Sequence, residues 1–85
     1  MSYQVLLHPR VIKFLKKVSK KDYERIKVKL SELADPYSVK AIKLKGKKSS
    51  FRVRVGDYRI LYTVDDSRKV VVVFKVDWRG RAYKH

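Results

Sequence analysis

The chain has 85 residues, and its 23 lysines and arginines against 8 aspartates and glutamates give a formal net charge of +15, an excess that attracts polyanions or an acidic protein. One domain spanning residues 1–85 is expected, because 45% hydrophobic residues suffice for a compact core. The absence of cysteine excludes disulfide scaffolds, cysteine-ligated zinc and thiol catalysis, and no apolar run suits a signal peptide or a membrane span, so a cytoplasmic location is expected.

The first half of the chain predicts a strand followed by two helices. Residues 3–7 form a short apolar strand candidate. Apolar residues then follow helical spacing over residues 9–18 and again over residues 20–34. Ser19 followed by Asp22 resembles the N-terminal cap of the second helix. The simplest arrangement is two antiparallel helices joined by a short turn.

The second half of the chain predicts a sheet. Residues 37–50 form a lysine-rich connector that bends at Gly46. Alternating apolar residues then mark strands at 51–55, 58–64 and 70–78. The expected fold class is α+β, in the order strand–helix–helix–strand–strand–strand, with both helices packed on one face of a small, mainly antiparallel sheet.

A tight turn between the first two of these strands brings like charges together. Gly56 and Asp57 suit a two-residue hairpin turn of type II′, with glycine at its first central position. In that register Arg54 lies directly across from Arg59, and Arg52 lies on the same face. Like charges in this geometry are destabilising, and such a break of a local rule indicates a functional site. The face is therefore predicted to hold a strongly anionic ligand.

The last strand is predicted to extend this basic face. If residues 65–69 make the turn, Arg59 opposes Lys75, and Arg79 lies at the end of the same face. Parity then assigns one set of alternate residues to the core: Val70, Val72, Phe74, Val76 and Trp78. A less charged patch continues the basic face and could be covered by the chain's own loops or by a partner; it consists of Leu61, Thr63, Val71 and Val73.

Four motifs follow one another in this half of the chain. Residues 39–46 end in Lys-Leu-Lys-Gly, 51–55 read Phe-Arg-Val-Arg-Val, 56–62 read Gly-Asp-Tyr-Arg-Ile-Leu-Tyr, and 78–83 read Trp-Arg-Gly-Arg-Ala-Tyr. In this order they resemble the RelE/ParE toxin superfamily, and specifically the RelE-like messenger RNA endonucleases. The chain departs from the pattern at three positions: Arg52 and Arg54 stand where well-known members have lysines, and Trp78 replaces the usual histidine.

The resemblance implies the toxin of a type II toxin–antitoxin system, which cleaves messenger RNA in the A site of a 70S-type ribosome. Cleavage would need no metal and no cofactor: the ribose 2′-hydroxyl attacks the adjacent phosphate and leaves a 2′,3′-cyclic phosphate. The second partner implied is an acidic, RelB-like antitoxin. The catalytic residues that the resemblance implies are Arg52, Arg54, Arg59, Arg79 and Tyr83.

Guanidinium groups suit this chemistry because their planar forks bind phosphate oxygens at two points. We assign Arg59 and Arg79 to the scissile phosphate, and Arg52 and Arg54 to positioning or to the leaving group. Arginine stays protonated and is a poor base, so Tyr83 is the preferred proton-transfer group, with His85 as the alternative.

Further basic residues are expected to bind the RNA backbone without reading its sequence: Lys43, Lys45, Lys47, Lys48, Lys75 and Arg81. For the lysines of the connector, a solvated loop is the alternative. Trp78 could stack on a base, although its parity favours packing. His8 is interpreted as a helix cap or a surface residue, because two distant histidines and scattered aspartates make no metal-ligand cluster.

Three alternatives stay open. A ParE-like inhibitor of DNA gyrase would share the fold and cut no RNA. A non-catalytic module that binds RNA or the ribosome would need only the positive charge. A degenerate toxin with weak activity would be compatible with the change from lysine to arginine at positions 52 and 54.

Overall fold

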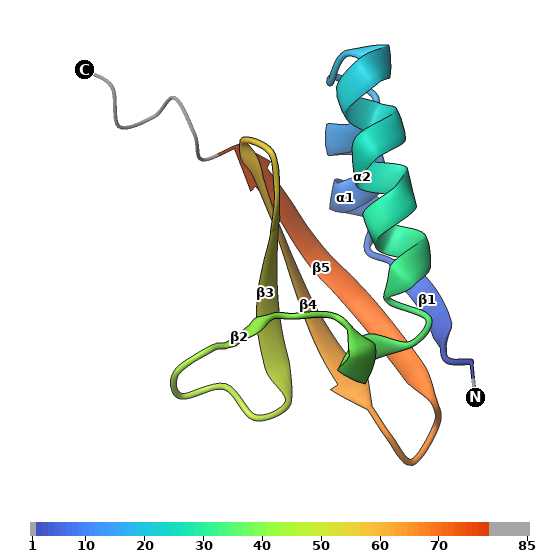
Figure 1. The fold of residues 1–85 in the computed structure, drawn as a ribbon, viewed down its shortest axis with the longest axis vertical. Coiled ribbons are helices and arrows are strands. Elements are labelled where there is room, and N and C mark those ends of the chain that lie inside the picture. Colours follow the sequence, from blue (N-terminus) through green and yellow to red (C-terminus); the bar gives the residue numbers. More distant parts are fainter. Residues whose placement is uncertain (1, 79–85) are drawn as a thin grey trace.

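The computed structural model describes residues 2–78, which form two helices against one mixed sheet (Figure 1). The elements are β1 (Gln4–Leu7), α1 (Pro9–Leu15), α2 (Lys20–Glu32), a 3₁₀ turn η1 (Pro36–Ser38), β2 (Ile42–Lys43), β3 (Ser50–Val55), β4 (Tyr58–Asp65) and β5 (Val70–Trp78). The strand order is β1-β5-β4-β3-β2, with β1 parallel to β5 and the other neighbours antiparallel. The predicted α+β fold is therefore confirmed, with one addition: the short strand β2 lies inside the expected connector.

Both helices begin where the sequence predicts and end earlier. The His8 imidazole accepts a hydrogen bond from the Arg10 amide at 3.1 Å, and the Ser19 hydroxyl accepts one from the Asp22 amide at 3.1 Å. The cap interpretation of His8 and that of Ser19 are confirmed. Each helix closes with tightened bonds, in which the Lys16 amide donates to the Lys13 carbonyl and the Leu33 amide to that of Leu30. These turns contain residues that helical spacing alone had assigned to the helices, and both helices are therefore shorter than predicted.

The core lies between the helices and one face of the sheet. Its buried side chains are Val11, Leu15, Ile26, Leu30, Leu33, Val53, Tyr58, Ile60, Tyr62, Val64, Val71, Val73 and Val76. Tyr58 joins the two layers, because its hydroxyl donates to the Asp22 carboxylate of α2 at 2.8 Å. Burial and this hydrogen bond raise the pKa of Tyr58 to about 12.

A second polar cluster joins three distant segments at one edge of the fold. Tyr3 precedes β1, Tyr37 belongs to η1, and Asp66 lies in the turn after β4. The Asp66 carboxylate accepts hydrogen bonds from the Tyr3 hydroxyl at 2.7 Å and from the Tyr37 hydroxyl at 2.8 Å. These bonds hold the pKa of Asp66 below its ordinary value.

The hairpin of β3 and β4 has the predicted register. Val55 pairs with Tyr58 and Arg54 pairs with Arg59. A type II′ turn requires a positive φ at its first central residue and not at its second. Gly56 has a φ of +57°, and the φ of Asp57 is not positive, so the turn meets this requirement. Arg25 of α2 lies against this turn, so that a Cβ on Gly56 would come within 2.9 Å of its guanidinium.

The predicted register of β4 and β5 is wrong. Arg59 pairs with Asp77, whereas Lys75 pairs with Leu61, and the register shifts between Leu61 and Tyr62. An extra residue on β5 causes this shift, as in a β-bulge, and it reverses the side-chain parity of the strand. The turn before β5 is also one residue shorter than predicted, since Asp65 pairs with Val70 and Val64 with Val71. The predicted core positions Val70, Val72 and Phe74 are therefore wrong: they are only half-buried, whereas Val71 and Val73 are fully buried. Of the other two predicted core positions, Val76 is buried and Trp78 is exposed.

Trp78 combines packing with exposure. Its side chain is 43% exposed, but its ring meets the Tyr58 ring edge-on with the centroids 5.1 Å apart. The favoured interpretation of Trp78 as a packing residue is therefore supported. Within residues 2–78, the helices are too short or too polar to cross a membrane.

Candidate nucleic-acid interface

The sheet face that the helices leave open carries the three described arginines of the predicted site. Alternate residues of β4 are buried beneath the helices, so Arg59 and Leu61 point to the opposite side. The strand register arranges this open face in two rows. The first row contains Arg54, Arg59 and Asp77, and the second contains Arg52, Leu61 and Lys75. With about 4.8 Å between neighbouring strands, each row spans about 10 Å of backbone.

Arg59 and Asp77 form the central contact of the first row. The Arg59 Nε donates to Asp77 Oδ1 at 3.0 Å, and Nη2 donates to Oδ2 at 2.9 Å. The two side chains are 25% and 22% exposed, so solvent only partly screens the pair. Lys75 Nζ lies 3.8 Å from Asp77 Oδ2. The sequence had placed Lys75 opposite Arg59, and the structure corrects this, because an acid occupies that position and Lys75 lies beside the acid.

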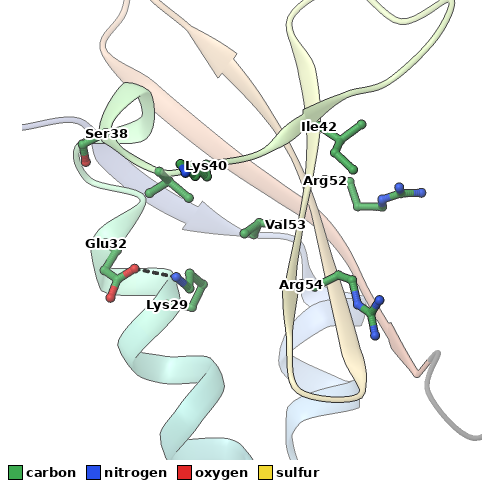
Figure 2. A pocket seen from close by; sticks show the side chains of 9 residues that line it. Lys29, Glu32, Ser38, Lys40, Ile42, Arg52, Val53 and Arg54 are labelled. Atoms are coloured by element: carbon green, nitrogen blue, oxygen red, sulfur yellow. Dashed lines mark hydrogen bonds and ion pairs between the residues drawn. The ribbon is translucent and has the colours of Figure 1, made fainter.

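Arg52 and Arg54 differ from Arg59 in their surroundings. Arg54 is exposed and Arg52 is half-buried, and neither forms an ion pair with an acid in the described part of the chain. Figure 2 shows both guanidinium groups on the same side of β3, pointing away from Lys29 and Glu32. Both arginines are therefore accessible to an anion that approaches the open face.

One groove of the structure borders these arginines, and Arg52 and Arg54 are among the residues that line it. It has a volume of about 580 Å³ and runs between the end of α2 and the outer edge of β3 (Figure 2). Lys29, Lys40 and Ile42 contribute to its lining, and its acid Glu32 is held by Lys29 at 2.7 Å. Since the guanidinium groups point away from α2, we place the candidate interface on the open face and not in this groove.

The predicted lysines are only partly brought together with the arginines. Lys47 Nζ lies over the Phe74 ring, 5.8 Å from its centroid, so the loop before β3 reaches across to β5. Lys45 and Lys48 are exposed in the same loop. Lys43 is separated from the arginines, because it pairs with Phe51, whose ring stacks on the core residue Tyr62.

Four residues of the predicted site lie outside the residues that the structure describes: Arg79, Arg81, Tyr83 and the alternative base His85. One residue of the open face was missed by sequence reasoning, namely Asp77. Its negative charge, between Lys75 and Arg79 in the sequence, was the available signal, but the shorter turn and the bulge hid its partner. Among residues 2–78, no group of three histidines, aspartates or glutamates is placed to hold a metal ion.

Comparison with known proteins defines the class. Residues 5–83 match the family described as the ParE toxin of type II toxin–antitoxin systems, parDE. The chain therefore belongs to the RelE/ParE superfamily of type II toxins, as its motifs predicted. Within that superfamily its relatives are RelE proteins: the mRNA interferase toxin RelE of Escherichia coli (strain K12) is 30% identical over 84 residues, which cover 96% of this chain and 88% of the relative. The chain is a RelE-like toxin.

Solved structures agree with this assignment. RelE in the archaeal RelE–RelB complex from Pyrococcus horikoshii OT3 is similar with a TM-score of 0.82 and 35% identity, covering 96% of this chain and 100% of that chain. The isolated E. coli RelE toxin is similar with a TM-score of 0.82 and 27% identity, covering 98% of this chain and 90% of that one. Both structural similarities cover nearly the whole chain, and therefore include the sheet face that carries the arginines.

Proposed function

We propose that this RelE-like toxin is a ribosome-dependent endoribonuclease that cleaves messenger RNA in the A site of a 70S-type ribosome and so arrests translation. The observation that carries the proposal is the gathering of Arg52, Arg54 and Arg59 on one open sheet face. The relative from E. coli is named an mRNA interferase, which agrees with this activity. Neither a metal nor a cofactor is part of the proposal.

The proposed reaction is an internal transfer at phosphorus. The ribose 2′-oxygen loses its proton and bonds to the adjacent phosphorus, and the bond from phosphorus to the 5′-oxygen breaks. The 5′-oxygen takes up a proton, and the other fragment ends in a 2′,3′-cyclic phosphate. Negative charge grows on the non-bridging oxygens during attack, and the arginines are suited to stabilise it. DNA lacks the 2′-hydroxyl and would resist cleavage.

The proposed roles within the site rest on the chemistry of the side chains and on the resemblance to RelE-like toxins. Arg59, together with Arg79, is proposed to bind the scissile phosphate. Arg52 and Arg54 are proposed to position the message or to stabilise the leaving oxygen. Tyr83 is proposed to transfer the proton, because neighbouring cations favour its phenolate. The remaining basic residues are proposed to bind phosphates of the RNA backbone: Lys43, Lys45, Lys47, Lys48, Lys75 and Arg81.

An acidic, RelB-like antitoxin is the proposed second partner. The net charge of +15 favours association with an acidic chain, and the P. horikoshii relative forms a complex with RelB. A groove of about 480 Å³ between the helices supports the same idea, because it combines the apolar Ile12 and Tyr23 with Lys16 and Lys20. An amphipathic acidic segment would match both features of this groove.

The test is single-turnover cleavage of a message on programmed ribosomes, with detection of the cyclic phosphate end. Arg59→Ala is expected to lower the rate by about 30- to 1000-fold, which corresponds to about 2–4 kcal/mol of transition-state stabilisation. Arg68→Ala is the matched control, since its side chain is 82% exposed in the turn between β4 and β5. Equal rates for the wild type and Arg59→Ala would remove Arg59 from the site, and an intact message with the wild type would refute the nuclease.

The description of the matching family favours one second candidate, a ParE-like inhibitor of DNA gyrase. Such a toxin would inhibit supercoiling by purified gyrase and leave the programmed ribosome's message uncut. Running the two assays on one preparation separates the candidates. Inhibited gyrase together with uncut RNA would replace the nuclease proposal with this one.

A further inference from the structure

The first row of the open face holds two positive side chains and one negative one. Arg54 and Arg59 are directly paired across β3 and β4, and Asp77 is paired with Arg59 on the other side. Two guanidinium groups in such a pair repel each other. The two-point contact with Asp77 draws the Arg59 guanidinium toward β5, and therefore away from Arg54.

The contact also fixes the orientation of the guanidinium plane. Asp77 engages the edge formed by Nε and Nη2, at 3.0 Å and 2.9 Å. A fork-to-fork contact of this kind constrains both the position and the plane of an arginine, which a single hydrogen bond does not. Lys75, with its Nζ 3.8 Å from Oδ2, adds a second cation that keeps the carboxylate in place.

We propose that Asp77 is a positioning residue for Arg59, which holds the guanidinium toward β5 so that Arg54 and Arg59 meet the RNA as two separate cations. This inference rests on the proposed function, because it concerns how the site is aligned for cleavage. Asp77 itself takes no proton and touches no substrate. Its effect on the reaction passes through Arg59.

The principal variant is Asp77→Asn, which keeps the shape of the side chain and removes the charged fork. We expect single-turnover cleavage to fall by roughly 10- to 100-fold, because small displacements of a catalytic group have costs of this size. Binding of a non-cleavable RNA with a 2′-deoxy scissile nucleotide should be as tight as in the wild type or tighter, since the variant carries one negative charge fewer. A loss of rate without a loss of affinity separates positioning from a general loss of structure.

A double-mutant cycle shows whether the effect passes through Arg59. Adding Asp77→Asn to Arg59→Ala should change the cleavage rate by less than about 2-fold, because the group to be positioned is already gone. Glu24→Gln makes the same change in net charge on the exposed surface of α2 and should leave the rate unchanged. If Asp77→Asn does not fold, Asp77→Glu replaces it, and its rate should fall below that of the wild type.

A spectroscopic measurement follows Arg59 without using activity. In ¹⁵N-labelled protein, the Nε–H of Arg59 should exchange slowly with water in the wild type and at least about 10-fold faster in Asp77→Asn, as expected when a charge-assisted hydrogen bond is lost. Cleavage at the wild-type rate by Asp77→Asn, or an equal loss in the Arg59→Ala background, would overturn this inference and leave the nuclease intact. An uncut message with the wild-type chain would overturn the proposed function and, with it, this inference.

Discussion

The turn between β3 and β4 offers a test of how closely the helix layer approaches the sheet. Gly56 has a φ of +57°, and this left-handed region costs a residue with a Cβ about 1–2 kcal/mol. In Gly56→Ala the new Cβ would also lie 2.9 Å from Arg25 Nη2 and 3.1 Å from Nη1, so the guanidinium has to move. Alanine recovers about 0.4–1 kcal/mol by restricting the unfolded chain. We expect the free energy of unfolding to fall by about 1–2 kcal/mol.

Gly46→Ala is the matched control, because Gly46 has a φ of +71° and its Cβ would meet no heavy atom of the described residues within 4 Å. Only the backbone cost applies there, so the loss should be about 0.5–1 kcal/mol. Urea unfolding followed by the fluorescence of Trp78, the single tryptophan, measures both variants. Each kcal/mol should also lower the Tm by about 4–8 °C in a domain of this size. Equal losses at the two glycines would show that the approach of Arg25 costs nothing, and a stabilised Gly56→Ala would refute the argument from φ.

Three further predictions concern stability, and urea unfolding measures each. Tyr58→Phe removes the hydrogen bond to Asp22 and should cost about 1–2 kcal/mol. Because the folded pKa of Tyr58 is raised from 10.0 to about 12, this contribution is complete below pH 10 and disappears as the pH rises to about 12; a cost independent of pH would contradict it. Asp66→Asn should destabilise at neutral pH and not in acid, because the lowered pKa of Asp66 makes its contribution present above the unfolded value and lost as the pH falls through the folded one. Val71→Ala should cost about 1.5–3 kcal/mol and Val72→Ala less than about 1 kcal/mol, and the reverse order would contradict the pairing of Val64 with Val71.

The hairpin was predictable because polar and apolar residues alternate along most of its length. Arg52 and Arg54 alternate with buried or half-buried residues of β3, and one glycine-containing turn sets the register. The pairing of Arg54 with Arg59 therefore followed from the sequence alone. The same reasoning identified the open face before its neighbours were known.

The end of β5 was not predictable in the same way. Residues 70–73 are four successive valines, so nothing in the pattern shows which of them face the core. The turn before β5 is one residue shorter than predicted, and the bulge near Phe74 shifts the register by one more residue, so Asp77 and not Lys75 reaches Arg59. The strand β2 has only two residues, both exposed, and too few to show alternation. When packing and not the alternation of polar and apolar residues sets the register of a strand, the sequence alone does not predict which residue pairs with a charged one.

The order of the strands has a consequence for when the toxin can act. β1 is synthesised first, but its neighbour in the sheet is β5, whose residues follow nearly the whole described chain. Closing so long a loop is entropically costly and comparatively slow, so the edge of the sheet is completed late. Asp77 lies in β5, so its contact with Arg59 can form only after β5 has joined the sheet. During most of its own translation the nascent chain therefore lacks a finished basic face, which can form only after β5 has been synthesised.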